Sequence, residues 1–318
     1  MDPNVAAFFS DEPVVDAPPY TPPMVDADYS RQPGGYTHEP HHDHRWIYHN
    51  LTAVRLNPLG LTNRFRTGYR GQLSHRPEKV FDESFASVQL DTEITPAFGY
   101  VGGRFEVQPA AILNFWASYG MVGSFGTFST TRSFSDAQQD YSDDTLKDSR
   151  DQDYSSIGHK AVVSGLFQVG IGGLALRNNI KGNFASMDLR DDDRVFYDAS
   201  LDVLMPNSGW VLTNDADLLI VTDFDLVVGV RHTFTAALYK KDQLAGGDNL
   251  NTPHHRVGPA IIYSFFDDGI GTDWNKPTLV LLAQWWMKHR YRTTNSPALP
   301  YIVIGFVQQG DFMLSDKE

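Results

Sequence analysis

Apolar side chains recur at every second residue over long segments of this sequence, and no other feature limits its possible folds as strongly. In the segment 279–292, Leu279 and Leu281 mark one face, while Gln284 and Lys288 lie on the other. Alternate residues of a β-strand point to opposite sides, so a period of two predicts a strand with one apolar and one polar face. The helical period of 3.6 is rare from residue 45 onward. We therefore predict an all-β protein.

Thirteen segments show this alternation, and residues that favour turns separate them. Asn57–Gly60, Pro206–Gly209 and Asp267–Gly269 are examples of such turns. Each segment is predicted to form one strand. The thirteen segments are 46–57, 61–73, 83–94, 97–108, 110–123, 160–171, 174–187, 195–205, 210–220, 224–239, 256–266, 279–292 and 299–312.

The length of these segments separates two all-β architectures. Strands of a soluble sandwich average about 5–6 residues, whereas a tilted strand needs about 9–11 residues to cross a bilayer. Strands of this length with one apolar and one charged face predict a transmembrane barrel, apolar toward lipid and polar toward its lumen. The mean hydropathy of −0.33 fits, because half of each strand would face the lumen. Aromatic residues near the predicted strand ends fit the interfacial girdles of such a barrel, and they are Trp46, Tyr48, Trp210, Phe224, Tyr239, Tyr263, Phe265, Tyr291 and Tyr301.

With these strands, turns and one long acidic loop, residues 45–318 resemble Gram-negative outer-membrane β-barrel proteins. The resemblance is one of class and points to no single family. It implies an antiparallel up-and-down barrel with an even number of strands in the bacterial outer membrane. One of the thirteen segments is therefore expected to be misassigned, either 46–57 or one within 160–187. We expect twelve strands, with fourteen as the alternative.

Both ends of the sequence bear on this resemblance. The class usually ends on a terminal aromatic, whereas six residues follow Phe312 here. Residues 1–10 lack the basic and apolar regions of a secretory signal. Either the protein stays inside the cell, or the given chain is a processed form behind an added methionine. For an outer-membrane protein, the second reading is the expected one.

The net charge of −13 is concentrated in two segments. Residues 1–44 hold eight acidic residues, Arg31 alone as a base, and paired prolines, which predicts a disordered acidic arm rich in proline and histidine. Residues 126–157 hold seven aspartates against three basic residues, which predicts a long exposed acidic loop. The arm's histidines could hold a metal ion, but a solvated spacer is the favoured interpretation. The absence of cysteine excludes disulfides, and the acidity argues against nucleic acid as a partner.

The predicted inward faces carry charges of both signs. Residues 64–70 should lie beside 83–93, and 177–181 beside 198–202, so that ion pairs form across neighbouring strands. We also predict a basic seam where Lys288, Arg290 and Arg292 of the last strands meet the first ones. The residues predicted to face the lumen and its solutes are Arg64, Arg66, Arg70, Arg104, Arg177, Lys181, Lys288, Arg290, Arg292, Glu83, Asp91, Glu93, Asp198, Asp202, Asp215 and Asp217.

The leading functional hypothesis is a porin-like channel for small, anionic solutes, with lipid and those solutes as partners. The alternative is a non-conducting barrel that anchors a cell-surface or envelope assembly through its arm and acidic loop. A barrel-embedded hydrolase is a weaker alternative. It would use Asp267, Asp268, His254 or His255, since no serine and histidine share a strand face at a suitable spacing. We expect no enzyme activity, no cofactor and no metal site.

Overall fold

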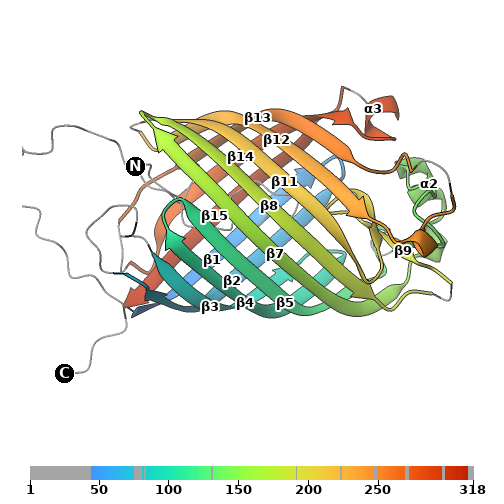
Figure 1. Cartoon of the computed structure of the whole chain (residues 1–318), viewed down its shortest axis with the longest axis horizontal. Helices are drawn as coiled ribbons and strands as arrows, with labels where there is room; N and C mark the ends of the chain where they lie inside the picture. Colours follow the sequence, from blue (N-terminus) through green and yellow to red (C-terminus); the bar gives the residue numbers. More distant parts are fainter. Residues whose placement is uncertain are drawn as a thin grey trace, which may run out of the picture.

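The computed structural model describes residues 44–74, 81, 84–129, 132–190, 192–222, 224–246, 249–268, 272–295 and 298–313. The predicted arm lies outside these residues, except for His44. Within them, twelve antiparallel strands close into one barrel (Figure 1). The strands are β1 (His44–Leu56), β2 (Gly60–Gln72), β3 (Phe85–Ile94), β4 (Phe98–Ala110), β5 (Leu113–Phe125), β7 (Ser155–Ile171), β8 (Leu174–Met187), β11 (Gly209–Val221), β12 (Leu226–Leu238), β13 (His254–Ser264), β14 (Asn275–Lys288) and β15 (Tyr301–Met313).

The barrel closes where its first and last strands pair. β1 lies between β2 and β15, and in the register Asn50 stands opposite Gln308. Going around the barrel, each strand otherwise pairs with the next barrel strand in the sequence. The predictions of an up-and-down barrel and of twelve strands are confirmed.

The misassigned segment is 195–205, and not 46–57 or 160–187 as we expected. It forms two four-residue strands, β9 (Val195–Asp198) and β10 (Val203–Pro206), which pair with β6 (Ser133–Phe134) in a separate three-stranded sheet. β9 and β10 are buried along almost their whole length, so neither has a lipid-facing side. That burial explains why a segment with apolar alternation is not a barrel strand.

The small sheet belongs to a cap that covers one end of the barrel. The cap also contains α2 (Asp143–Asp148), η3 (Arg150–Gln152) and η4 (Lys241–Gln243), and α3 (Arg292–Asn295) lies at the same end in the connection from β14 to β15 (Figure 1). β1 begins and β15 ends at the opposite barrel end, which we call the terminal end. The described residues of the acidic segment that precede β7 thus fold as part of the cap rather than as an open loop, because Ala137, Tyr141 and Leu146 are buried in its core.

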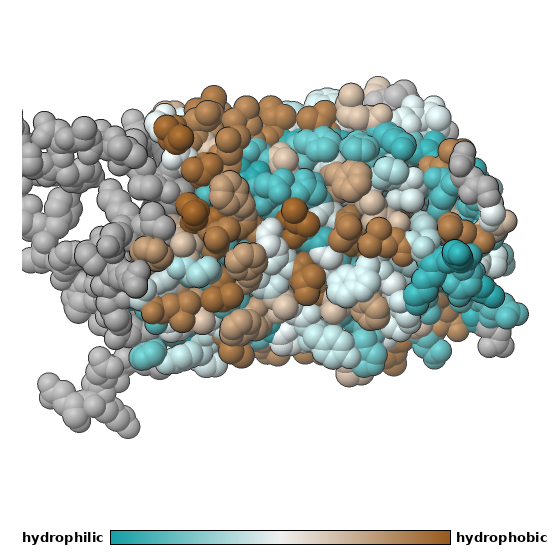
Figure 2. Space-filling model, in the orientation of Figure 1, coloured by the Kyte–Doolittle hydropathy of each residue, from teal (hydrophilic) through white to brown (hydrophobic). Residues whose placement is uncertain are grey.

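The outer wall of the barrel is apolar. On the face shown in Figure 2, apolar side chains gather on the wall toward the terminal end, and hydrophilic ones lie over the cap. A closed barrel leaves no unpaired strand edge, and an apolar outer wall suits it to hydrocarbon, so this is the wall of a membrane-spanning barrel. Outward side chains with exposed surfaces include Val88, Leu90, Val101, Phe105, Met121, Val163, Ile180, Leu218, Val230 and Ile304.

Among the described residues, none of the helices has the length and apolar character needed to cross a membrane.

Candidate functional site in the barrel interior and its cap

One network of buried charges lines the interior of β2 to β5. The guanidinium of Arg64 donates two hydrogen bonds to the carboxylate of Asp91, at 2.8 and 2.5 Å. Arg104 pairs with Glu106 at 3.3 Å, and its guanidinium lies 3.9 Å from the centre of the Trp116 ring. Buried charges are tolerated better when an opposite charge lies beside them, as Asp91 lies beside Arg64 and Glu106 beside Arg104.

A second network joins β8, β11 and β12. Arg231 binds the carboxylate of Asp217 through two hydrogen bonds of 2.6 Å, and Arg177 reaches the same carboxylate at 3.3 Å. Asp215 accepts a hydrogen bond of 2.6 Å from Thr233. The carboxylate of Asp217 on β11 therefore binds one guanidinium group from each of the two strands beside it, β8 and β12.

Apolar residues fill the remaining part of the interior. A cluster of twelve buried residues from β1, β11, β12, β13, β14 and β15 includes Leu51, Leu219, Ile262 and Val307. Arg256 lies beside this cluster, with its guanidinium 4.0 Å from the Tyr301 ring centre. The interior thus has a charged side and an apolar side.

Several interior side chains in the middle of the barrel are shielded from water. The lining residues of an open pore must be accessible to water, whereas Asp91 and Gln284 are 0% exposed and Arg104 is 1% exposed. Asp217 is 4% exposed. At this level the interior side chains are therefore packed against one another rather than exposed to water.

The cap is fastened to the barrel by a cluster of buried polar residues that we call the cap latch: Tyr141, Asp202, His254, His289 and Arg292. Asp202, in the turn between β9 and β10, accepts hydrogen bonds from Arg292 at 2.8 and 3.1 Å. His289 lies 3.3 Å from the same carboxylate. Tyr141 approaches His254 at 3.2 Å. The latch therefore joins two cap segments to the chain that follows β14 and to the start of β13.

The electrostatics of the latch favour an ionised Asp202. Burial by itself would raise the pKa of Asp202, but Arg292 and His289 hold that pKa well below its ordinary value. Tyr197 donates a hydrogen bond of 2.9 Å to the same carboxylate, and burial together with the charge of Asp202 raises the pKa of Tyr197 well above its ordinary value. At neutral pH the latch therefore contains the carboxylate ion of Asp202, which accepts a hydrogen bond from the neutral phenol of Tyr197 beside it.

The latch gives a pH prediction for the cap. A carboxylate whose pKa is depressed by folding stabilises the fold above its unfolded pKa of about 3.9, and this stability is lost as pH falls through the folded pKa. The contribution of Asp202 to cap protection should therefore be constant from pH 7 to about pH 4 and should decline only below that. Hydrogen exchange of segment 195–206 across this range tests it. In Asp202→Asn, the decline should be smaller, and an unchanged decline would assign the effect to other carboxyl groups.

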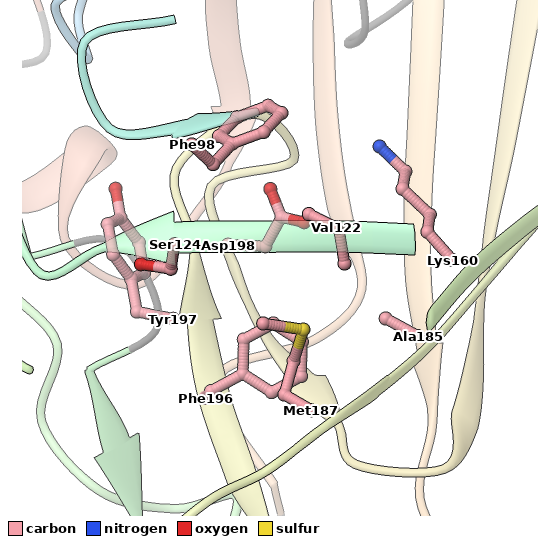
Figure 3. Close-up of a pocket in the computed structure, with 9 residues that line it drawn as sticks. All are labelled: Phe98, Val122, Ser124, Lys160, Ala185, Met187, Phe196, Tyr197 and Asp198. Atoms are coloured by element: carbon pink, nitrogen blue, oxygen red, sulfur yellow. The ribbon is translucent and has the colours of Figure 1, made fainter. Parts of the chain in front are cut away.

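A small pocket lies where the cap sheet meets the inner wall. Its volume is about 40 Å³, which is room for a few water molecules. Lys160 and Asp198 are its charged residues, and most of the remaining lining is apolar (Figure 3). The pocket is too small to serve as a solute passage. Its lining residues are Phe98, Val122, Ser124, Lys160, Ala185, Met187, Phe196, Tyr197 and Asp198.

Only part of the predicted lumen residues lies buried inside the barrel. Asp198, Asp202, Arg290 and Arg292 belong to the cap and its connections, and Lys288 is exposed at the cap end of β14. Arg70 is half-buried on β2 with its guanidinium 4.0 Å from the Phe85 ring centre, and Glu83 lies outside the described residues. The other nine are buried in the barrel: Arg64, Arg66, Arg104, Arg177, Lys181, Asp91, Glu93, Asp215 and Asp217. Whether any of them contacts a solute stays a prediction.

The predicted pairing of 64–70 with 83–93 corresponds to the Arg64–Asp91 ion pair. The predicted pairing of 177–181 with 198–202 is wrong. β8 pairs with β11, so Arg177 stands opposite Asp217, while Asp198 and Asp202 lie in the cap.

The basic seam is also wrong. β14 ends at Lys288, so Arg290 and Arg292 follow the strand instead of lining it. β15 and β1 stand between β14 and β2, so the two predicted basic strands are not neighbours. On β2, Arg64 forms an ion pair with Asp91. Residues 288–292 therefore do not form the predicted basic seam with β2 in the part of the chain that the structure describes.

Several central residues were missed in the sequence. Arg231, Arg256 and Gln284 hold the interior networks together. In segment 224–239, the apolar residues Val228 and Val230 mark the face toward lipid. Arg231 lies on the opposite face, so the alternation could have placed it in the barrel interior. No comparable signal marks Tyr141, which reaches the latch from a cap segment.

The hydrolase alternative lacks an assembled site. His254 and His255 begin β13 at the cap end, whereas Asp267 and Asp268 follow β13 at the terminal end. Asp202 and His289 do approach each other, but they are 1% and 2% exposed. Among the described residues, no three histidine or acidic side chains are grouped so as to hold a metal ion. His38, His41 and His42 lie outside the described residues.

No known protein family matches the chain, and no curated protein does. Among solved structures, it is similar to the translocator domain of the autotransporter NalP from Neisseria meningitidis, at 11% identity over 86% of this chain and 90% of that one, with a TM-score of 0.41. The outer membrane protein Omp33 from Acinetobacter baumannii is 10% identical over 85% and 99% of the two chains, with a TM-score of 0.35. The monoaromatic hydrocarbon channel CymD is 10% identical over 86% of this chain and 89% of that one, with a TM-score of 0.37. Similarity this low concerns the fold alone, and function is inferred below from this chain's own side chains.

Proposed function

We propose that this chain is an integral barrel of the bacterial outer membrane, with its cap outside the cell. An even number of strands and an apolar outer wall support this placement. The long connections of the cap gather at one end, while β1 begins and β15 ends at the other. In bacterial barrels the long loops are extracellular and the short turns periplasmic.

Within that membrane, we propose that the protein works as a closed barrel that anchors and presents its folded cap. One observation carries this proposal: the ion pairs Arg64–Asp91 and Arg231–Asp217 lie inside the barrel and are almost fully buried. The cap offers a folded outer surface, and its helix α2 begins with Asp143 and Asp144. Such a surface suits envelope or cell-surface proteins that carry basic segments.

A gated channel for small solutes is the second candidate. It is favoured by the ionic character of one side of the interior, because apolar residues would fill a permanently closed barrel equally well. If the cap and its latch moved away, water could hydrate the paired charges and open a polar path along β2 to β5. This candidate needs a conformational change, whereas the closed barrel needs none.

Conductance in planar bilayers separates the two candidates. The closed barrel predicts no current above background from the wild-type protein, while an open porin inserted in the same way conducts. A gated channel predicts brief openings that become frequent when the latch is broken by Asp202→Ala. Steady wild-type conductance would contradict the closed barrel. If neither the wild-type protein nor Asp202→Ala conducts, and heat-dependent gel mobility verifies that both barrels are folded, the gated channel is contradicted.

A further inference from the structure

Polar side chains interrupt the apolar outer wall where the barrel closes. We call Asn50 and Thr52 of β1, Asn63 of β2 and Gln308 of β15 the seam patch. The three strands lie side by side (Figure 1). Asn50 stands opposite Gln308, and Thr52 opposite Asn63, so the four side chains form one continuous surface.

The seam patch lies within the lipid-facing belt rather than at its rims. Outward positions alternate along β1, and the polar pair Asn50 and Thr52 comes between exposed Trp46 on one side and exposed Val54 and Leu56 on the other. On β15, Gln308 comes between exposed Ile304 and exposed Phe312. Hydrocarbon on both sides of these amides offers no hydrogen-bonding partner.

Hydrogen bonds inside the seam patch satisfy only part of it. The amide nitrogen of Asn63 donates to Oδ1 of Asn50 and to Oγ1 of Thr52, both at 2.9 Å. Among the described residues, nothing accepts from the amide nitrogen of Asn50, nothing donates to Oδ1 of Asn63, and the side chain of Gln308 has no hydrogen bond. The patch therefore keeps both donors and acceptors for an outside partner.

A second pair of outward-facing amides shows that polar groups on the outer wall can satisfy one another's hydrogen bonds without an outside partner. Asn178 of β8 and Asn214 of β11 also lie between exposed apolar residues of their strands. Their amides donate to each other, at 3.2 and 3.1 Å. This pair closes on itself, whereas the seam patch does not.

We propose that the seam patch is the contact surface between two copies of this chain in the membrane, an inference that rests on the membrane placement proposed above. Two copies insert in the same direction, so a twofold axis between them must run parallel to the barrel axis. Residues at one depth then meet residues at the same depth, and a patch of unpaired amides meets its own copy. Because an amide both donates and accepts, the patch is complementary to itself.

Aromatic side chains beside the seam patch add apolar contact area to this interface. The ring of Tyr48 stacks on Phe65 and Phe312, with centroids 6.4 and 6.1 Å apart. Trp46 donates a hydrogen bond of 2.7 Å to Thr67. No charged side chain is part of the seam patch, so no oppositely charged partner is required.

Cross-linking in lipid vesicles tests the proposal, because the chain contains no cysteine. Asn50→Cys should form a covalent dimer with a short bismaleimide, and Asn214→Cys, at the self-satisfied pair, should not. In parallel, Asn50→Leu/Gln308→Leu should weaken self-association measured by energy transfer by about tenfold. The matched control Asn178→Leu/Asn214→Leu should leave self-association unchanged.

The outcomes separate this inference from the membrane placement. A protein that inserts into vesicles and migrates as a folded barrel but remains monomeric overturns the dimer alone. Equal cross-linking at both cysteines, or cross-linking in native membranes to a different protein only, also overturns it. A protein that fails to insert and is soluble without detergent overturns the placement itself.

Discussion

Replacing Asp217 by leucine is expected to lower the free energy of unfolding by about 3–5 kcal/mol, because removing one partner leaves uncompensated buried charges. Asp217 is 4% exposed and binds Arg231 through two hydrogen bonds of 2.6 Å. Arg177 depends on the same carboxylate. Both guanidinium groups would remain in the closed interior without it, since Asp215 lies 3.8 Å from Arg231 and offers a weaker contact. Urea unfolding in detergent, followed by tryptophan fluorescence, measures the change.

The charges, rather than the volume of the side chain, should account for this loss. In Asp217→Leu/Arg177→Met/Arg231→Met, the stranded cations are also removed, and most of the lost stability should return. Asp242→Leu is a control for the removal of a paired carboxylate at the surface, since Asp242 is 63% exposed and pairs with Arg194 at 3.8 Å. Exposed pairs contribute about 0–1 kcal/mol. A similar loss in the triple variant would mean that packing explains the effect.

The sequence predicts the barrel well because a membrane imposes the same demand on every strand. Each barrel strand must turn one side to lipid and the other to the interior, so its alternation is visible without any knowledge of its neighbours. The segment 195–205 fails because burial on both sides removes that demand.

The interior networks were predictable only where the paired residues lie on strands adjacent in the sequence. Arg64 and Asp91 satisfy that condition and pair as neighbours of β2 and β3. Arg177 does not, because the cap strands β9 and β10 intervene between β8 and its true neighbour β11. The latch residues Tyr141, Asp202 and Arg292 come from three separate connections, and no periodic pattern relates their positions. Their contact depends on how the cap folds as a whole.

Replacing Arg292 by leucine is expected to release the cap while the barrel stays folded. Asp202 is 1% exposed, and Arg292 supplies two of its hydrogen bonds, so the variant would leave a buried carboxylate with His289 and Tyr197 alone. Arg292 also pairs with Asp143 at the start of α2. Loss of a partner from a buried ion pair costs about 3–5 kcal/mol, and here this cost falls on the contact between the cap and the barrel. Cap segments 132–153 and 195–206 should therefore exchange amide hydrogens faster and become sensitive to protease.

Arg194→Leu provides the matched control, because it makes the same chemical change in the cap at an exposed ion pair. Arg194 is 47% exposed in its side chain and lies 3.8 Å from Asp242, so its removal should change cap protection little. Heat-dependent mobility in gels should remain that of a folded barrel in both variants, since the interior networks do not include these arginines. Equal protection of the cap in wild type and Arg292→Leu would show that the apolar packing of β9 and β10 holds it without the latch. Faster exchange confined to the cap would instead identify Asp202 and Arg292 as the contact that keeps the barrel covered.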